Sequence, residues 1–117
     1  YLGTVPYVLR GWAHANAEAL VAYLQACIEG LRWVLDPANK AEAIKLAAER
    51  LTVPADIAAE IYAAAADPVN GLAKDAAFDL QGFKTVLRLR AGFEGCPPAP
   101  PEKYFDLSFH RQAMAGL

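Results

Sequence analysis

Few residues in this 117-residue sequence could bind a metal or act as a nucleophile. The two histidines, His14 and His110, are far apart along the chain, and neither has cysteine or carboxylate neighbours at metal-site spacing. The single serine, Ser108, stands two residues before His110, and two such side chains on a helix point in different directions. We therefore predict no metal, no cofactor and no catalytic residue, which means that the protein is not an enzyme.

The two cysteines lie in different sequence surroundings. Cys27 falls on the apolar side of an expected helix, whereas Cys96 stands beside a run of prolines. A disulfide between them would require an oxidising compartment. The alternative is one buried thiol and one loop thiol, and the sequence leaves both open.

The charged residues exclude some further classes of site. Five aspartates stand mostly beside turns and expected helix starts, where capping explains them: Asp36, Asp67, Asp75, Asp79 and Asp106. No glycine spacing matches a phosphate-binding loop. The net charge of −2 comes without a basic patch, so we expect no nucleic-acid partner. A small basic group at Lys84, Arg88 and Arg90 is typical of a solvated helix face, with partner binding as the alternative.

The first half of the chain has the pattern of successive helices. Residues 5–15 have helical spacing after a short extended stub, although residues 4–9 would also suit a strand. Asn16 is expected to cap a helix that ends before Pro37. Its apolar face is Leu20, Leu24, Cys27, Ile28, Leu31 and Leu35.

Two further helices are expected before the middle of the chain. Asn39 with Glu42 has the spacing of a capping box and opens a helix that ends near Leu51. Pro54 begins the next helix, which reaches Ala66 and should bury Ile57, Ile61 and Ala65.

The second half is divided by turn and proline signals. Asp67-Pro68 and Asn70-Gly71 indicate turns. Asp79 should cap a helix, Gly95–Pro101 should be extended because it holds four prolines, and Asp106 should cap a last short helix. No apolar run approaches the roughly 20 residues that a bilayer requires. The expected fold is mainly α, a small array of four to six short helices.

Four sequence phrases resemble a known family. These are residues 12–20, residues 33–43 with Asp36-Pro37-Ala38-Asn39, residues 79–90 and residues 104–109. Together they resemble the C-terminal third of the periplasmic solute-binding proteins of ABC importers, in the nitrate, sulfonate, taurine and thiamine-precursor class. Ala17 departs from the pattern, because the family usually has proline there.

The resemblance implies that residues 1–117 form one C-terminal segment, the helical layer of a two-lobed α/β fold. An importer receptor would deliver a small solute such as nitrate, a sulfonate, taurine or a pyrimidine to a membrane permease, and would work in the periplasm. Residues 1–4 would be a stub that returns through the hinge, which places Tyr1 and Thr4 as ligand-binding residues near the cleft. Most solute contacts would come from the other lobes.

A second interpretation is a free-standing helical domain for protein interaction or dimerisation. It would bury wide apolar helix faces between two copies of the chain, and a homodimer is then the expected state. The apolar beginning of the chain, Tyr1 to Val5, favours the receptor segment over this alternative.

Overall fold

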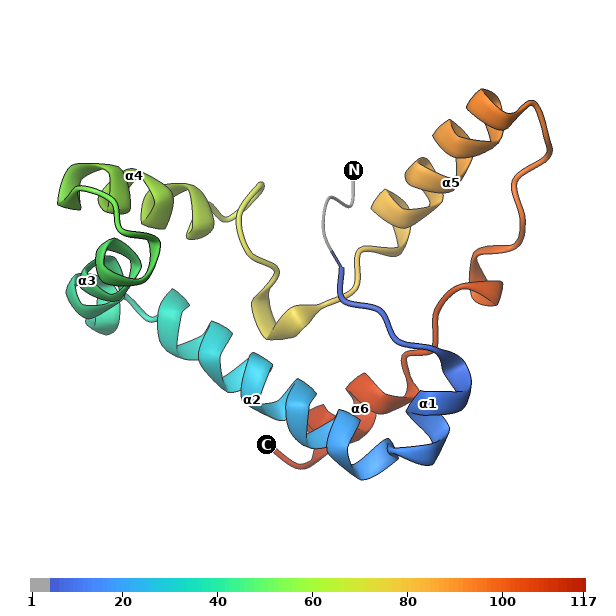
Figure 1. The fold of residues 1–117 in the computed structure, drawn as a ribbon, viewed down its shortest axis with the longest axis horizontal. Helices are drawn as coiled ribbons and strands as arrows, with labels where there is room; N and C mark the ends of the chain where they lie inside the picture. Colours follow the sequence, from blue (N-terminus) through green and yellow to red (C-terminus); the bar gives the residue numbers. More distant parts are fainter. Residues whose placement is uncertain (1–4) are drawn as a thin grey trace. The chain divides into compact units, whose positions relative to one another are not determined.

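The computed structural model describes residues 5–117, and within that range the chain is helical and contains no β-strand. Six α-helices follow one another along the chain (Figure 1): α1 (Arg10–Ala15), α2 (Ala17–Leu35), α3 (Lys40–Leu51), α4 (Ala55–Ala65), α5 (Leu80–Glu94) and α6 (Ser108–Ala115). Three short 3-10 turns lie between them: η1 (Pro37–Asn39), η2 (Lys74–Ala76) and η3 (Pro101–Lys103). The prediction of a mainly α array of four to six helices is confirmed.

The helices belong to two compact units. One unit joins the chain up to Leu24 with the segment Phe78–Leu117, and the other is Gln25–Ala77. The boundary therefore falls within α2. No helix in the described part of the chain is both long and apolar enough to cross a bilayer.

In the unit Gln25–Ala77, α3 and α4 pack against each other. Thr52 ends α3 in the left-handed conformation, with φ 56°, and Pro54 then starts α4. The buried side chains of these two helices are Ala43, Ala58 and Tyr62. The Lys40 ammonium lies 6.0 Å from the centre of the Tyr62 ring. Such a cation–π contact at an accessible site contributes about 0.5–1 kcal/mol.

In the other unit, four aromatic rings connect α5 to the segment before α6. We call Phe78, Phe83, Tyr104 and Phe105 the aromatic cluster. Its ring centroids are 5.1–6.3 Å apart and the rings are tilted or edge-on, the geometry that aromatic pairs prefer. Leu87 and Ala91 of α5 and Phe109 and Ala113 of α6 are buried in the same unit.

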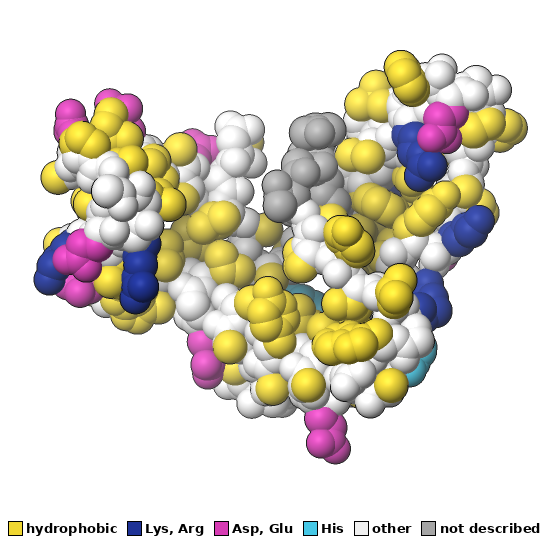
Figure 2. All heavy atoms as spheres, viewed as in Figure 1, with side chains coloured by type: hydrophobic (Ala, Val, Ile, Leu, Met, Phe, Trp, Pro, Cys, Tyr) yellow, Lys and Arg dark blue, Asp and Glu magenta, His cyan; other side chains and the backbone are white. Residues whose placement is uncertain are grey.

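Burial is sparse for so apolar a sequence. Among the described residues, four large hydrophobic side chains are buried, namely Ile28, Tyr62, Leu87 and Phe109. Five alanines complete the buried hydrophobic set. Figure 2 shows hydrophobic side chains over much of the visible surface, with basic side chains beside them over α5. Most helices therefore keep an apolar face that their own unit leaves uncovered.

Some details of the predicted helix ends were wrong. The first helix begins at Arg10, and residues 5–9 form neither the helix nor the strand that the sequence allowed. Pro6 has no backbone N–H and fixes its own φ, which limits regular structure there. Asn16 stands directly before α2, as expected, and its carbonyl accepts the N–H of Leu20 at 3.0 Å. Its side-chain amide donates to the carbonyl of Trp12 at 2.9 Å, at the end of α1.

The capping box expected at Asn39 and Glu42 does not form. Asn39 makes no side-chain cap of α3, because its amide donates 3.0 Å to the Trp33 carbonyl instead. The turn η1 precedes α3 directly, and Asp36 caps that turn through a 2.9 Å bond from the Ala38 N–H. Asp36 therefore caps η1, and α3 begins without a side-chain cap.

Candidate functional site

The two predicted ligand-binding residues, Tyr1 and Thr4, lie outside the described residues. Their role remains a prediction from the family resemblance. The remaining candidates are two surface hollows, a polar cluster before α6 and two cysteines.

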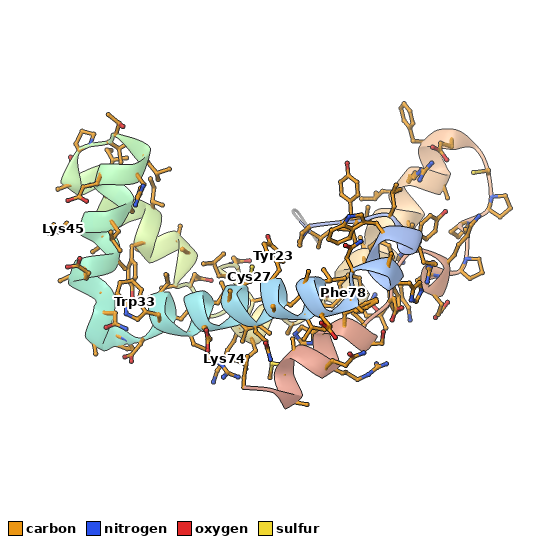
Figure 3. The ribbon with its side chains drawn as sticks, turned by 60° about the horizontal axis from the view of Figure 1, so that its bottom comes forward. Tyr23, Cys27, Trp33, Lys45, Lys74 and Phe78 are labelled. Carbon is orange, nitrogen blue, oxygen red and sulfur yellow. The ribbon has the colours of Figure 1, made fainter. Side chains whose placement is uncertain are left out.

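The larger hollow lies at the end of α2, within the unit Gln25–Ala77. We call it the α2-end hollow. It is open to solvent, has a volume of about 560 Å³, and is lined by Arg32, Leu35, Asp36, Pro37, Lys74 and Asp75. Figure 3 shows Lys74 on the segment that passes beside α2. Two of these lining residues are cationic and two are carboxylates. A hollow with charges of both signs could bind a small zwitterion.

Most of the charged groups of the α2-end hollow already have a partner within the chain. Arg32 Nε lies 2.6 Å from Asp75 Oδ1, and Asp36 uses Oδ1 to cap η1. The Lys74 and Arg32 cations also suit the negative end of α2. Because the Arg32 and Asp75 side chains are 42% and 25% exposed, solvent screens their pair, which contributes no more than about 1 kcal/mol. Three of the four charged groups that line the hollow, Arg32, Asp75 and Asp36, are therefore already engaged within the chain.

The backbone at the rim of this hollow is strained. Asp75 and Ala76 have φ values of 56° and 53°, in the left-handed region that side chains with a Cβ disfavour. Arg32 holds Asp75 in this conformation from α2, so the ion pair positions a turn. Sequence reasoning missed this contact, because Arg32 and Asp75 are 43 residues apart and no local pattern pairs them.

The smaller hollow follows the bend between α1 and α2. It has a volume of about 410 Å³ and is lined by six consecutive residues, His14 to Ala19. Small-molecule sites usually gather a few polar groups from several elements into an enclosed space. A hollow made by one bend, with three alanines in its wall, does not have that form.

The polar cluster at the start of α6 consists of Asp106, Ser108 and, from α1, His14. The Asp106 carboxylate accepts the backbone N–H of Ser108 at 2.9 Å. Hydrogen bonds from the Ser108 hydroxyl and then from its N–H lower the pKa of Asp106, and the charges of Arg10 and His14 act in the same direction. The His14 ring is instead 5.9 Å from the ring of Phe109. Ser108 has an aspartate and not a histidine at its hydroxyl, so the cluster is a helix-start motif and not a nucleophile with its base.

Both cysteines are free thiols, in agreement with one of the two open alternatives. Cys27 is half-buried on α2, and Cys96 is exposed, with Sγ 3.7 Å from Glu94 Oε2. Figure 3 places Cys27 on the middle of α2. Among residues 5–117, no group of three or more His, Cys, Asp or Glu side chains is placed to hold a metal ion.

Comparisons with protein-family models, with curated proteins and with solved structures gave no match to this chain.

Proposed function

We propose that this chain is the helical part of a periplasmic receptor that captures a small solute for an ABC importer, without covalent chemistry. The observation that carries the proposal is the amount of uncovered apolar surface. Among the described residues, 18 large hydrophobic side chains are exposed, against the four that are buried. A layer of helices that packs on two larger lobes would need such faces.

The family resemblance of residues 12–20 and 33–43 supports the same role. The two tryptophan phrases coincide with α1, the start of α2 and the α2–η1–α3 connection, so they lie at helix joints. Solute contacts are then assigned mainly to the other lobes and to the stub with Tyr1 and Thr4. The open hollows of the described residues agree with that division, since neither would enclose a small molecule.

The experiment compares the complete product of the source gene with the 117-residue chain. Both are heated with nitrate, taurine, a short alkanesulfonate or a hydroxymethylpyrimidine. We expect one compound to raise the melting temperature of the complete protein, since a ligand at 100 times its Kd adds about 2.7 kcal/mol. The 117-residue chain should not respond. A gene product limited to these residues, or no response of a longer product to any compound, would overturn the proposal.

A second candidate, a helical dimerisation domain, is favoured by one feature of α4. Ile57 and Ile61 lie four residues apart on one face and are 40% and 39% exposed. Asp56 and Glu60 stand beside them and would form a polar rim. Sedimentation velocity of the 117-residue chain tests this function. A dimer that Ile57→Lys dissociates supports it, provided that Val69→Lys, at a side chain 85% exposed outside α4, leaves the dimer intact.

A further inference from the structure

The segment Gly95–Pro101, which we call the proline strap, leaves α5 and returns to η3 (Figure 1). Its first end is fixed by the end of α5. Gly95 has φ 67°, and the N–H groups of Gly95 and Cys96 both donate to the carbonyl of Ala91. A left-handed glycine with two N–H groups bonded to one otherwise unpaired helix carbonyl is a well-defined helix end.

The second end of the proline strap is held by η3 and the aromatic cluster. The N–H groups of Lys103 and Tyr104 donate to the carbonyls of Pro100 and Pro101 at 3.1 Å and 2.9 Å. Tyr104 then contacts Phe83 of α5, with ring centroids 6.3 Å apart. The proline strap is therefore fixed at both ends within one unit.

Between its ends the proline strap is set in an extended conformation by its own residues. Residues 97–100 belong to no helix or strand. Proline fixes its own φ near −65°, and a residue that precedes proline avoids the helical region. Pro100 has φ −54° and ψ 131°, close to the polyproline II helix. Pro97, Pro98 and Pro100 are exposed to solvent.

Polyproline II has three residues per turn, so Pro97 and Pro100 share one face of the strap. Grooves lined by aromatic side chains recognise this P-x-x-P spacing, because the ligand is rigid before it binds and loses little conformational entropy. We propose that the proline strap is a docking segment for a second protein with such an aromatic-lined groove. The strap cannot extend a β-sheet edge, since three of its four residues from 97 to 100 have no N–H to donate.

The proposal is independent of the solute-receptor role, because the proline strap makes no contribution to either hollow. Its flanking charges, Glu94, Glu102 and Lys103, are of mixed sign. Recognition is therefore by shape and apolar contact, and salt should weaken the binding little.

The test is an NMR titration of the ¹⁵N-labelled 117-residue chain with three unlabelled probes: an SH3, a WW and an EVH1 domain. We expect at least one probe to shift the amide signals of Cys96 and Ala99. Pro97→Ala and Pro100→Ala should each weaken that binding by about tenfold, a loss of about 1.4 kcal/mol. Pro68→Ala, at an exposed proline outside the strap, should leave it unchanged.

Unchanged ring signals of Phe83 and Tyr104 in the two strap variants would show that the aromatic cluster stays folded. Absence of any shift at Cys96 and Ala99 with all three probes at about 1 mM, a concentration that detects even weak binding, overturns the proposal. Binding that persists when Pro97 and Pro100 are both replaced by alanine also overturns the proposal.

Discussion

At the scale of single residues, carboxylates in this chain mainly fix local backbone. Asp36, Asp67, Asp79 and Asp106 each accept at least one backbone N–H within three residues of themselves. Their positions beside turns predicted this role from sequence alone. Asp75 is the exception, because its partner Arg32 is distant in sequence. Capping could be predicted because it is local, whereas a tertiary ion pair leaves no trace in neighbouring residues.

Asp79 should contribute measurably to stability. Its Oδ1 accepts the N–H of Gly82 at 2.8 Å and caps α5. We expect Asp79→Ala to lower the free energy of unfolding by about 1 kcal/mol, and Asp79→Asn to lower it much less, because asparagine also caps well. Urea denaturation of the three proteins measures the difference. Equal losses in both variants would show that the carboxylate charge, and not the cap, matters.

Asp106 should make stability depend on acid. Because its pKa is lowered below 3.8 in the folded chain, folding favours its ionised form. The stabilisation is then complete above the unfolded pKa, near 4, and is lost as the pH falls through the lower folded value. The group is exposed, so the effect should stay below about 1 kcal/mol.

A carboxyl ¹³C titration measures this directly, with Asp106→Asn as the variant that removes the titrating group. The stability difference between the native chain and the variant should be larger at pH 6 than at pH 2.5. A titration midpoint of Asp106 at or above 3.8 contradicts the expectation.

At the scale of elements, the sequence predicted which segments are helical better than it predicted which faces are buried. All the segments from α2 to α6 were expected, because capping residues, prolines and helical spacing mark them. On α4, however, Ala58 and Tyr62 are buried while Ile57 and Ile61 are partly exposed, one residue away from the expected face. The apolar arc of α4 includes both pairs, so periodicity alone could not choose between them.

A glycine inside α5 and the glycine that follows its last residue give a matched test of helix geometry. Gly92 lies inside the helix, and a Cβ there would meet nothing within 4 Å. Gly95 has equal space but φ 67°. We expect Gly92→Ala to stabilise the chain by about 0.4–1 kcal/mol, because alanine lowers the entropy of the unfolded chain. Gly95→Ala should destabilise it by about 1 kcal/mol, because alanine is strained in the left-handed region.

Thermal or urea unfolding of the two variants in parallel gives the comparison. Both substitutions add the same methyl group in equally open surroundings. If the two changes in unfolding free energy have opposite signs, the backbone conformation is the cause. Stabilisation by Gly95→Ala would mean that the end of α5 does not keep its left-handed residue in solution.

At the scale of the whole molecule, exposed apolar surface and low net charge should together control association. The net charge is −2 at pH 7 and the isoelectric point is near 5.6. Leu89 and Phe93 of α5 are 63% and 94% exposed. A protein without net charge has little repulsion to keep such surfaces apart.

We therefore expect the isolated chain to associate most strongly near pH 5.6 and to disperse at pH 8. Light scattering across this range checks the expectation. Phe93→Ser should reduce scattering at pH 5.6 and change stability by less than about 0.5 kcal/mol, because that side chain has little packing to lose. Scattering that is insensitive to both pH and Phe93→Ser would show that these surfaces do not drive association.

The left-handed pair at Asp75 and Ala76 has a consequence for how this sequence can change. Aspartate is among the residues that adopt such angles at moderate cost, but alanine gains nothing there to offset the crowding of its Cβ. Glycine would relieve that crowding, and alanine and glycine codons differ by one base. A more relaxed turn is thus a single mutational step away, so position 76 is the first place where laboratory evolution for heat resistance should find an improvement.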